Sequence, residues 1–165
     1  MTLNETLIAE LKHEAANTRK ILAKVPAEHF DYKPHDKSMT LKFLATHIAD
    51  LFGWTAYVLL TDQLDFQDND LQEPVINSTQ DLLDHLDMQV NASLAALTNA
   101  EAGVFDQNWV LRSGDYIIMD LPRSVTIRSM CMSHIYHHRG QLSVYLRLLD
   151  VKIPGMYGPS ADEMG

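Results

Sequence analysis

Apolar side chains recur at steps of three and four residues through four long stretches of this chain. The stretches cover residues 3–25, 41–60, 78–102 and 124–149. On a helix with about 3.6 residues per turn this spacing places the apolar side chains on one face, which must be buried. Four such helices predict an all-α fold, a four-helix bundle in antiparallel or near-antiparallel order. We expect residues 1–165 to form a single domain.

The segments between the predicted helices differ in composition. Residues 109–121 are β-branched and aromatic on both sides of a Ser-Gly-Asp turn, which predicts a short β-hairpin before the last helix. Residues 61–77 are rich in acidic side chains and contain a proline, so we expect a solvated connection. Residues 150–160 hold too much Pro and Gly for a helix, and we expect them to wrap over the bundle as irregular chain.

The charge of the chain argues against several kinds of partner. Thirteen Lys and Arg against 22 Asp and Glu give a net charge of -9, which repels a nucleic-acid backbone and an anionic membrane surface. No apolar run approaches the ~20 residues that cross a bilayer, and residues 1–10 are too acidic for a signal peptide. Cys131 is the single cysteine, which excludes an internal disulfide and fits a reducing compartment. We therefore expect a cytoplasmic protein with no nucleic-acid or membrane partner.

Three histidines lie on the apolar faces of predicted helices. His134 and His138 are one helical turn apart, so both rings can reach one ion. His47 lies on the apolar face of the second helix, where an imidazole needs hydrogen-bond partners or a metal. Three imidazoles from facing helices would bind a divalent ion and leave a coordination position open. The alternative is three core histidines satisfied by side chains or water, because the sequence does not show that these helices touch.

Three segments resemble the DinB/YfiT-like family. They are the loop at residues 32–41 that leads into His47, the His-x-x-x-His-Arg-Gly-Gln motif at residues 134–141, and the Pro-Gly-Met-Tyr-Gly-Pro-Ser-Ala-Asp ending at residues 154–162. The resemblance implies a four-helix bundle, often dimeric, in which three histidines bind a divalent ion such as zinc or nickel. Carried over residue by residue, the implied metal ligands are His47, His134 and His138.

The resemblance also bears on activity. Family members with known reactions include metal-dependent transferases and isomerases that use a low-molecular-weight thiol, such as bacillithiol or mycothiol. Our first hypothesis is accordingly a metal-dependent enzyme, a thiol-dependent transferase or a hydrolase, in which a thiol or water attacks a small electrophilic substrate. The second hypothesis is a noncatalytic metal-binding stress protein or helical interaction protein. A purely structural role for the histidines is the third, and the sequence assigns no catalytic residue.

Five other residues near these motifs have simpler interpretations. His137 points away from His138 and is expected at the helix flank, with a supporting role for the site as the alternative. Cys131 is expected to act as a small buried apolar residue, with an approach to the ion as the alternative. Asp50 is expected to face solvent, with orientation of a metal ligand as the alternative. Arg139 is expected to hold a carboxylate or the tail, with substrate binding as the alternative. Tyr157 either covers the site or packs with the chain end. The spacing of the remaining histidines assigns them no role: His13, His29, His35 and His85.

Overall fold

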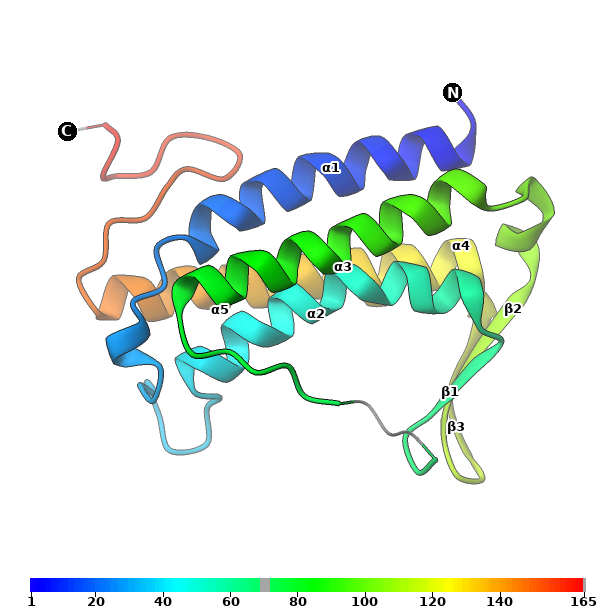
Figure 1. Cartoon of the computed structure of the whole chain (residues 1–165), viewed down its shortest axis with the longest axis horizontal. Helices are drawn as coiled ribbons and strands as arrows, with labels where there is room; N and C mark the ends of the chain where they lie inside the picture. The colour runs from blue at the N-terminus through cyan, green and yellow to red at the C-terminus, as the bar shows by residue number, and fades with distance from the viewer. Residues whose placement is uncertain (69–71, 165) are drawn as a thin grey trace.

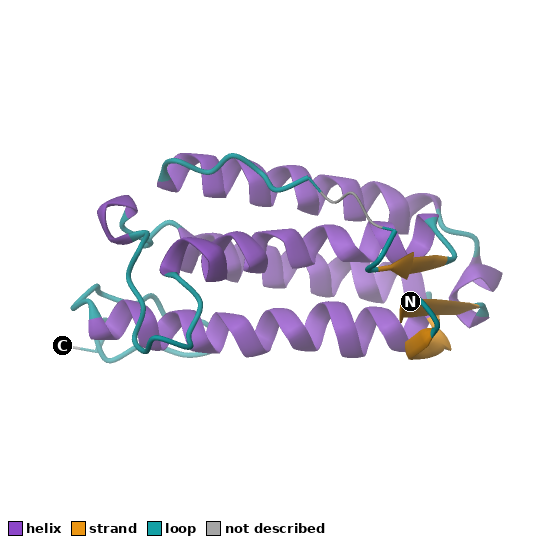
Figure 2. Ribbon diagram, turned by 90° about the horizontal axis from the view of Figure 1, so that it is seen from below, coloured by secondary structure: helices purple, strands orange, loops and turns teal. Residues whose placement is uncertain are grey.

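The computed structural model describes residues 1–68 and 72–164. Over these residues four long helices lie side by side, and three short strands gather at one end (Figures 1 and 2). The long helices are α1 (Leu3–Leu22), α2 (Leu41–Leu60), α3 (Thr79–Asn99) and α5 (Ser133–Leu148). Single 3-10 turns, η1 (Ala27–His29) and η2 (Ala102–Asp106), lie in the connections. The predicted four-helix fold is confirmed.

Side-chain caps set where the two central helices begin. The Thr40 hydroxyl accepts a hydrogen bond of 3.1 Å from the Phe43 N–H at the start of α2. The Ser78 hydroxyl accepts one of 3.1 Å from the Asp81 N–H at the start of α3. Each cap satisfies one of the N–H groups that a helix leaves unpaired in its first turn. The start of α2 matters for the site, because it determines which residues of α2 face α5.

The sheet contains the predicted hairpin and a strand that was not predicted. Strands β2 (Asn108–Ser113) and β3 (Tyr116–Pro122) pair antiparallel around Gly114, whose φ of 57° suits a glycine turn. Strand β1 (Gln63–Asp65) pairs parallel with β2 and buries Leu64. The expectation that residues 61–77 form only a solvated connection is therefore wrong. A strand of three residues is too short to show an alternating pattern in the sequence.

The last helical stretch is divided into three parts. Helix α4 (Arg123–Thr126) continues into a π-helical segment, η3 (Ile127–Met132), and then into α5. At the end of the π-helical segment both the backbone N–H and the hydroxyl of Ser133 bond to the Arg128 carbonyl, five residues earlier. The wider turn changes which face the following residues present. The prediction of one uninterrupted helix from residue 124 missed this segment. One extra residue in a single turn hardly changes the spacing of apolar residues at three and four positions.

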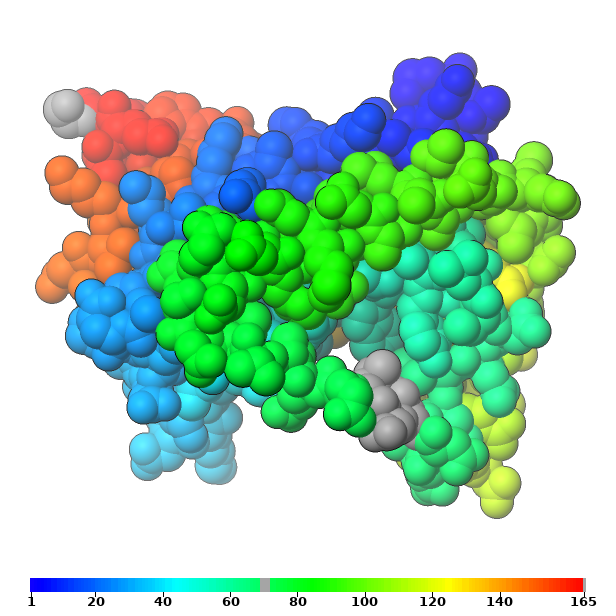
Figure 3. All heavy atoms as spheres, viewed as in Figure 1, coloured from blue at the N-terminus to red at the C-terminus, as the bar shows by residue number. Residues whose placement is uncertain are grey.

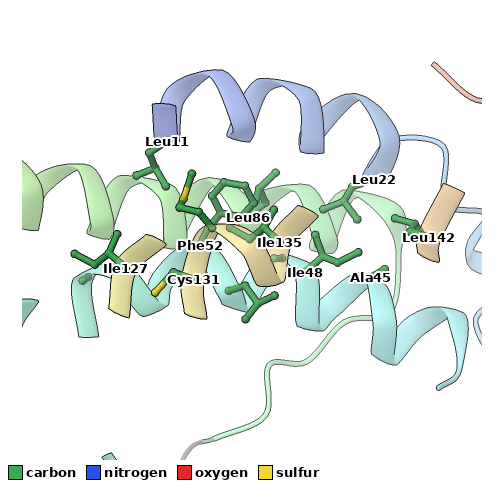
Figure 4. Packing of buried hydrophobic residues seen from close by; sticks show 14 of the residues in the cluster. Leu11, Leu22, Ala45, Ile48, Phe52, Leu86, Ile127, Cys131, Ile135 and Leu142 are labelled. Atoms are coloured by element: carbon green, nitrogen blue, oxygen red, sulfur yellow. The ribbon is translucent and has the colours of Figure 1, made fainter. Parts of the chain in front are cut away.

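Helix α2 forms the centre of the hydrophobic core. Figure 4 shows Ile48 and Phe52 of α2 packed with Leu86 of α3 and Ile135 of α5, all of them buried. By length and composition α2 is apolar enough to cross a bilayer, so the expectation that no stretch reaches that length is wrong. More than half of this helix is buried within the protein, and it is a core helix.

A buried ion pair ties the irregular tail to the bundle. The Arg139 guanidinium of α5 donates to the Glu14 carboxylate of α1 at 2.5 Å and to the Thr18 hydroxyl at 3.0 Å. The Tyr157 hydroxyl contacts Arg139 and donates to Glu14 at 2.9 Å. Arg139 therefore holds both a carboxylate and the tail, as expected. Tyr157 attaches the tail to this pair on α1 and α5.

Candidate metal centre

The three histidines on the apolar helix faces come together. One ring nitrogen from each of His47, His134 and His138 lies within 4.8 Å of the other two, and His47 Nε2 is 3.5 Å from His134 Nε2. The ring centroids are 4.6 to 5.1 Å apart. Rings at this separation can direct their nitrogens to one ion, as in sites built from three histidines. The cluster could hold a metal ion.

The packing of α2 against α5 creates this cluster. His134 and His138 are adjacent because α5 places residues four apart on one face. His47 joins them because its neighbour Ile48 and the α5 residue Ile135 are packed in the same core layer (Figure 4). The buried apolar residues thus hold two helices in the register that brings His47 opposite the α5 pair.

The environment keeps the three imidazoles neutral. Burial, followed by repulsion from His138 and His134, lowers the pKa of His47 from 6.5 to about 4. Burial is also the largest cause that lowers the pKa of His134 and of His138. A neutral imidazole offers a lone pair, which a protonated one lacks. Three neutral imidazoles fit a divalent ion such as zinc or nickel, and this donor set does not choose between them.

Gln141 fixes the orientation of one of these rings. Its side-chain Oε1 lies 2.7 Å from His138 Nδ1, and its Nε2 lies 3.1 Å from His137 Nε2. An amide oxygen only accepts, so His138 Nδ1 carries the proton and Nε2 is left with a lone pair for an ion. His137 stays at the exposed flank, as expected. It does not point away from the cluster, because its ring centroid lies 4.9 Å from that of His138 and it also hydrogen-bonds Gln141. The sequence showed Gln141 on the apolar face and in the family motif, without a role.

Replacing Gln141 by leucine should weaken metal binding by roughly 10 to 100-fold, because the His138 ring loses the acceptor that sets its tautomer. The change keeps the size of the side chain, so helix α5 should remain intact. Competition with a chromophoric chelator measures the affinity, and circular dichroism checks the fold. Gln141→Glu retains an acceptor oxygen and should bind metal more tightly than Gln141→Leu. Equal affinity of wild type and Gln141→Leu would remove the orienting role.

Comparison with known proteins identifies the family. The sequence profile of the DinB family matches residues 1–165. The chain belongs to the DinB family. A curated relative, the uncharacterized protein YrdA of Bacillus subtilis strain 168, is 26% identical over 150 residues, which cover 91% of this chain and 85% of YrdA.

Solved structures of DinB-like proteins share the fold. The DinB-like protein YjoA of Bacillus subtilis superposes with a TM-score of 0.73 at 19% identity, covering 94% of this chain and 99% of YjoA. A DinB-like protein of Bacillus cereus ATCC 10987 also has a TM-score of 0.73, at 22% identity, covering 93% of this chain and 97% of its own. At these identities the likeness concerns the fold alone.

Cys131 of this DinB protein is a buried, unreactive core residue. Its side chain is fully buried, and it is not among the residues that cluster with His134. Burial raises the pKa of its thiol to about 12, against a smaller opposing effect of a hydrogen bond with Thr55. A thiol of this kind is neither a nucleophile nor a metal ligand near neutral pH. The expectation of a small buried apolar residue is met.

A cavity opens beside His47. It has a volume of about 300 Å³ and lies between α2, α3 and the segment at residues 72–77, where Figure 3 shows the surface hollowed. His47 also lines an adjoining hollow of about 240 Å³. Prominent side chains of the larger cavity are His47, Asp50, Trp54, Tyr57, Glu73 and His85. A small molecule that enters the cavity therefore contacts His47, the member of the cluster that lines it.

Asp50 and His85 form a pair on the wall of this cavity. His85 Nε2 of α3 lies 2.5 Å from Asp50 Oδ1 of α2. Asp50 is 32% exposed and is paired with His85, so the expectation that it merely faces solvent is wrong. The sequence assigned no role to His85. No spacing within one helix could reveal the pair, because the two residues come from different helices.

Proposed function

We propose that this DinB protein is a divalent-metal-dependent enzyme that uses a low-molecular-weight thiol or water to attack a small electrophilic substrate. The reaction class is a thiol-dependent transferase or a hydrolase. The observation that carries the proposal is the convergence of His47, His134 and His138, kept neutral by burial, at the side of a cavity. A centre built only to stabilise the fold would have no need of a cavity beside it.

The residues of this site have separate tasks under the proposal. His47, His134 and His138 hold the ion, zinc or nickel being the metals that we favour. When bound, a divalent cation favours the thiolate of a nearby thiol or lowers the pKa of water. Trp54 and Tyr57 give the cavity apolar walls, which exclude water from the reacting groups.

Two further features belong to the same proposal. We place the protein in the cytoplasm, where low-molecular-weight thiols stay reduced. A single free cysteine fits this reducing compartment. We also propose that it works as a homodimer, on the strength of the family resemblance. Neither feature changes the residues that form the site.

Thiol transfer is the activity to test first. Zinc-loaded and nickel-loaded protein, each with a reduced thiol and a small alkyl halide, should form the thioether faster than the thiol alone. Mass spectrometry of the product measures the rate, and His47→Ala protein treated with the same metal and then dialysed should give only the background. An ester substrate without thiol tests the hydrolase alternative. Stable metal binding without either product would instead favour the noncatalytic metal-binding protein.

A further inference from the structure

The proposed reaction needs a group that accepts a proton. Near neutral pH a small thiol is mostly protonated, and its S–H proton must leave before the sulfur can attack. His47, His134 and His138 cannot take it while their lone pairs hold an ion. The acceptor is therefore either solvent or another residue that the fold brings to the cavity.

Asp50 is a residue of the cavity that can accept this proton. It follows His47 by three residues on α2, so the two side chains are neighbours on one helix face. Both line the cavity of about 300 Å³, and both also line the adjoining hollow. A molecule held next to His47 is thus next to Asp50 as well.

The buried side chain of His85 hydrogen-bonds the Asp50 carboxylate and fixes its position. The His85 side chain is 8% exposed, whereas that of Asp50 is 32% exposed. His85 is therefore the buried member of the pair, and the more exposed Asp50 carboxylate faces the cavity. The contact of 2.5 Å between His85 Nε2 and Asp50 Oδ1 restricts rotation of the carboxylate. This is the arrangement of an oriented acid–base group, with a buried partner that fixes its direction.

The surroundings make Asp50 a better base than an exposed aspartate. Burial is the largest cause that raises its pKa, and the Glu73 charge adds to it, against the lowering effects of His85. The other titratable groups that line the two hollows are Glu73 from the segment at residues 72–77, Lys42, His47 and Tyr57 from α2, and His85 from α3. A carboxylate with a raised pKa accepts a proton more readily.

We infer that Asp50, positioned by His85, accepts the proton of the thiol that binds in the cavity beside His47. This inference rests on the proposed function. The S–H bond breaks, the proton moves to an Asp50 carboxylate oxygen, and the electron pair stays on sulfur. The sulfur then bonds to the electrophilic carbon, the leaving group departs with its bonding electrons, and Asp50 returns the proton to that group. Asp50 is thus base and then acid, and His85 is a positioning residue.

Counting protons tests this inference without measuring turnover. Zinc-loaded protein is mixed with saturating β-mercaptoethanol in weakly buffered solution near neutral pH, with a pH indicator, and calorimetry confirms binding. Wild type should keep the thiol proton and release almost none. Asp50→Asn should release about one proton per bound thiol, since its amide cannot accept it. The S-methyl ether of the probe has no S–H and should release none from either protein.

Matched variants separate proton transfer from a structural effect. His85→Leu should release protons as Asp50→Asn does, whereas His85→Gln retains a donor to the carboxylate and should behave like wild type. Glu73→Gln removes the other carboxylate that lines the cavity, and this variant should retain the thiol proton as wild type does. Circular dichroism confirms that each variant is folded.

The outcomes distinguish the two proposals. Thiol binding with the same proton release in wild type and Asp50→Asn overturns the role of Asp50 and leaves the proposed thiol chemistry standing. No heat of thiol binding to zinc-loaded wild type overturns the inference together with the thiol-dependent branch of the proposed function, and leaves the hydrolase to the ester test. Loss of proton retention in Glu73→Gln alone would assign the acceptor to Glu73 and likewise overturn the inference.

Discussion

Replacing any one of His47, His134 and His138 by alanine should lower zinc affinity by more than about 100-fold. Loss of a group that merely orients a ligand already costs roughly 10 to 100-fold, and loss of the ligand itself should cost more. Untagged protein, purified without chelators or a nickel column and reconstituted with zinc, should carry about one ion per chain. Each variant should lose that ion on dialysis. Elemental analysis measures the content.

His137 provides the matched control for these variants. It lies on α5 beside His138 but at the exposed flank, so His137→Ala should keep the ion while it removes an equal amount of imidazole. Circular dichroism must show folded protein in every case. A parent protein that holds no zinc, nickel or manganese after reconstitution would remove the metal centre. Retention of the ion in His47→Ala would remove His47 from it.

Replacing Arg139 by alanine should destabilise the protein by about 3 to 5 kcal/mol, because the Glu14 carboxylate would remain buried without its cation. Arg139 is 3% exposed and Glu14 is 5% exposed, so water cannot replace the lost partner. The change also removes the contacts of the guanidinium with Thr18 and Tyr157, which join α1, α5 and the tail. Urea unfolding followed by circular dichroism measures the loss as a lower midpoint.

An exposed ion pair of the same type serves as the comparison. Arg19 of α1 lies 2.7 Å from Asp87 of α3, with both side chains about half exposed. Arg19→Ala should cost less than about 1 kcal/mol, since exposed ion pairs are screened by solvent. The double variant Glu14→Leu with Arg139→Leu should recover part of the stability, because it leaves no buried charge. Equal urea midpoints for Arg139→Ala and Arg19→Ala would show that loss of the buried Arg139–Glu14 pair costs no more stability than loss of the exposed Arg19–Asp87 pair.

The features that the sequence predicted well depend on local geometry. The apolar spacing of residues 3–25, 41–60 and 78–102 identified α1, α2 and α3, since a helix relates residues three and four apart in the same way wherever it occurs. The same rule placed His134 and His138 on one face. The Ser-Gly-Asp turn likewise located the hairpin of β2 and β3, because a tight turn is encoded within a few residues.

The features that only the tertiary structure decided depend on contacts between distant segments. His47 meets His134 across 87 residues of chain, and Asp50 meets His85 across 35, through the packing of separate helices. The apolar pattern shows which face of α2 is buried and leaves open which helix covers it. Strand β1 exists because β2 pairs with it, and the π-helical segment before α5 is a single local insertion in a regular pattern. The sequence by itself thus determined the helices and the histidine pair on α5, whereas the approach of His47 to that pair, the cavity and the Asp50–His85 pair on its wall follow from how the helices pack.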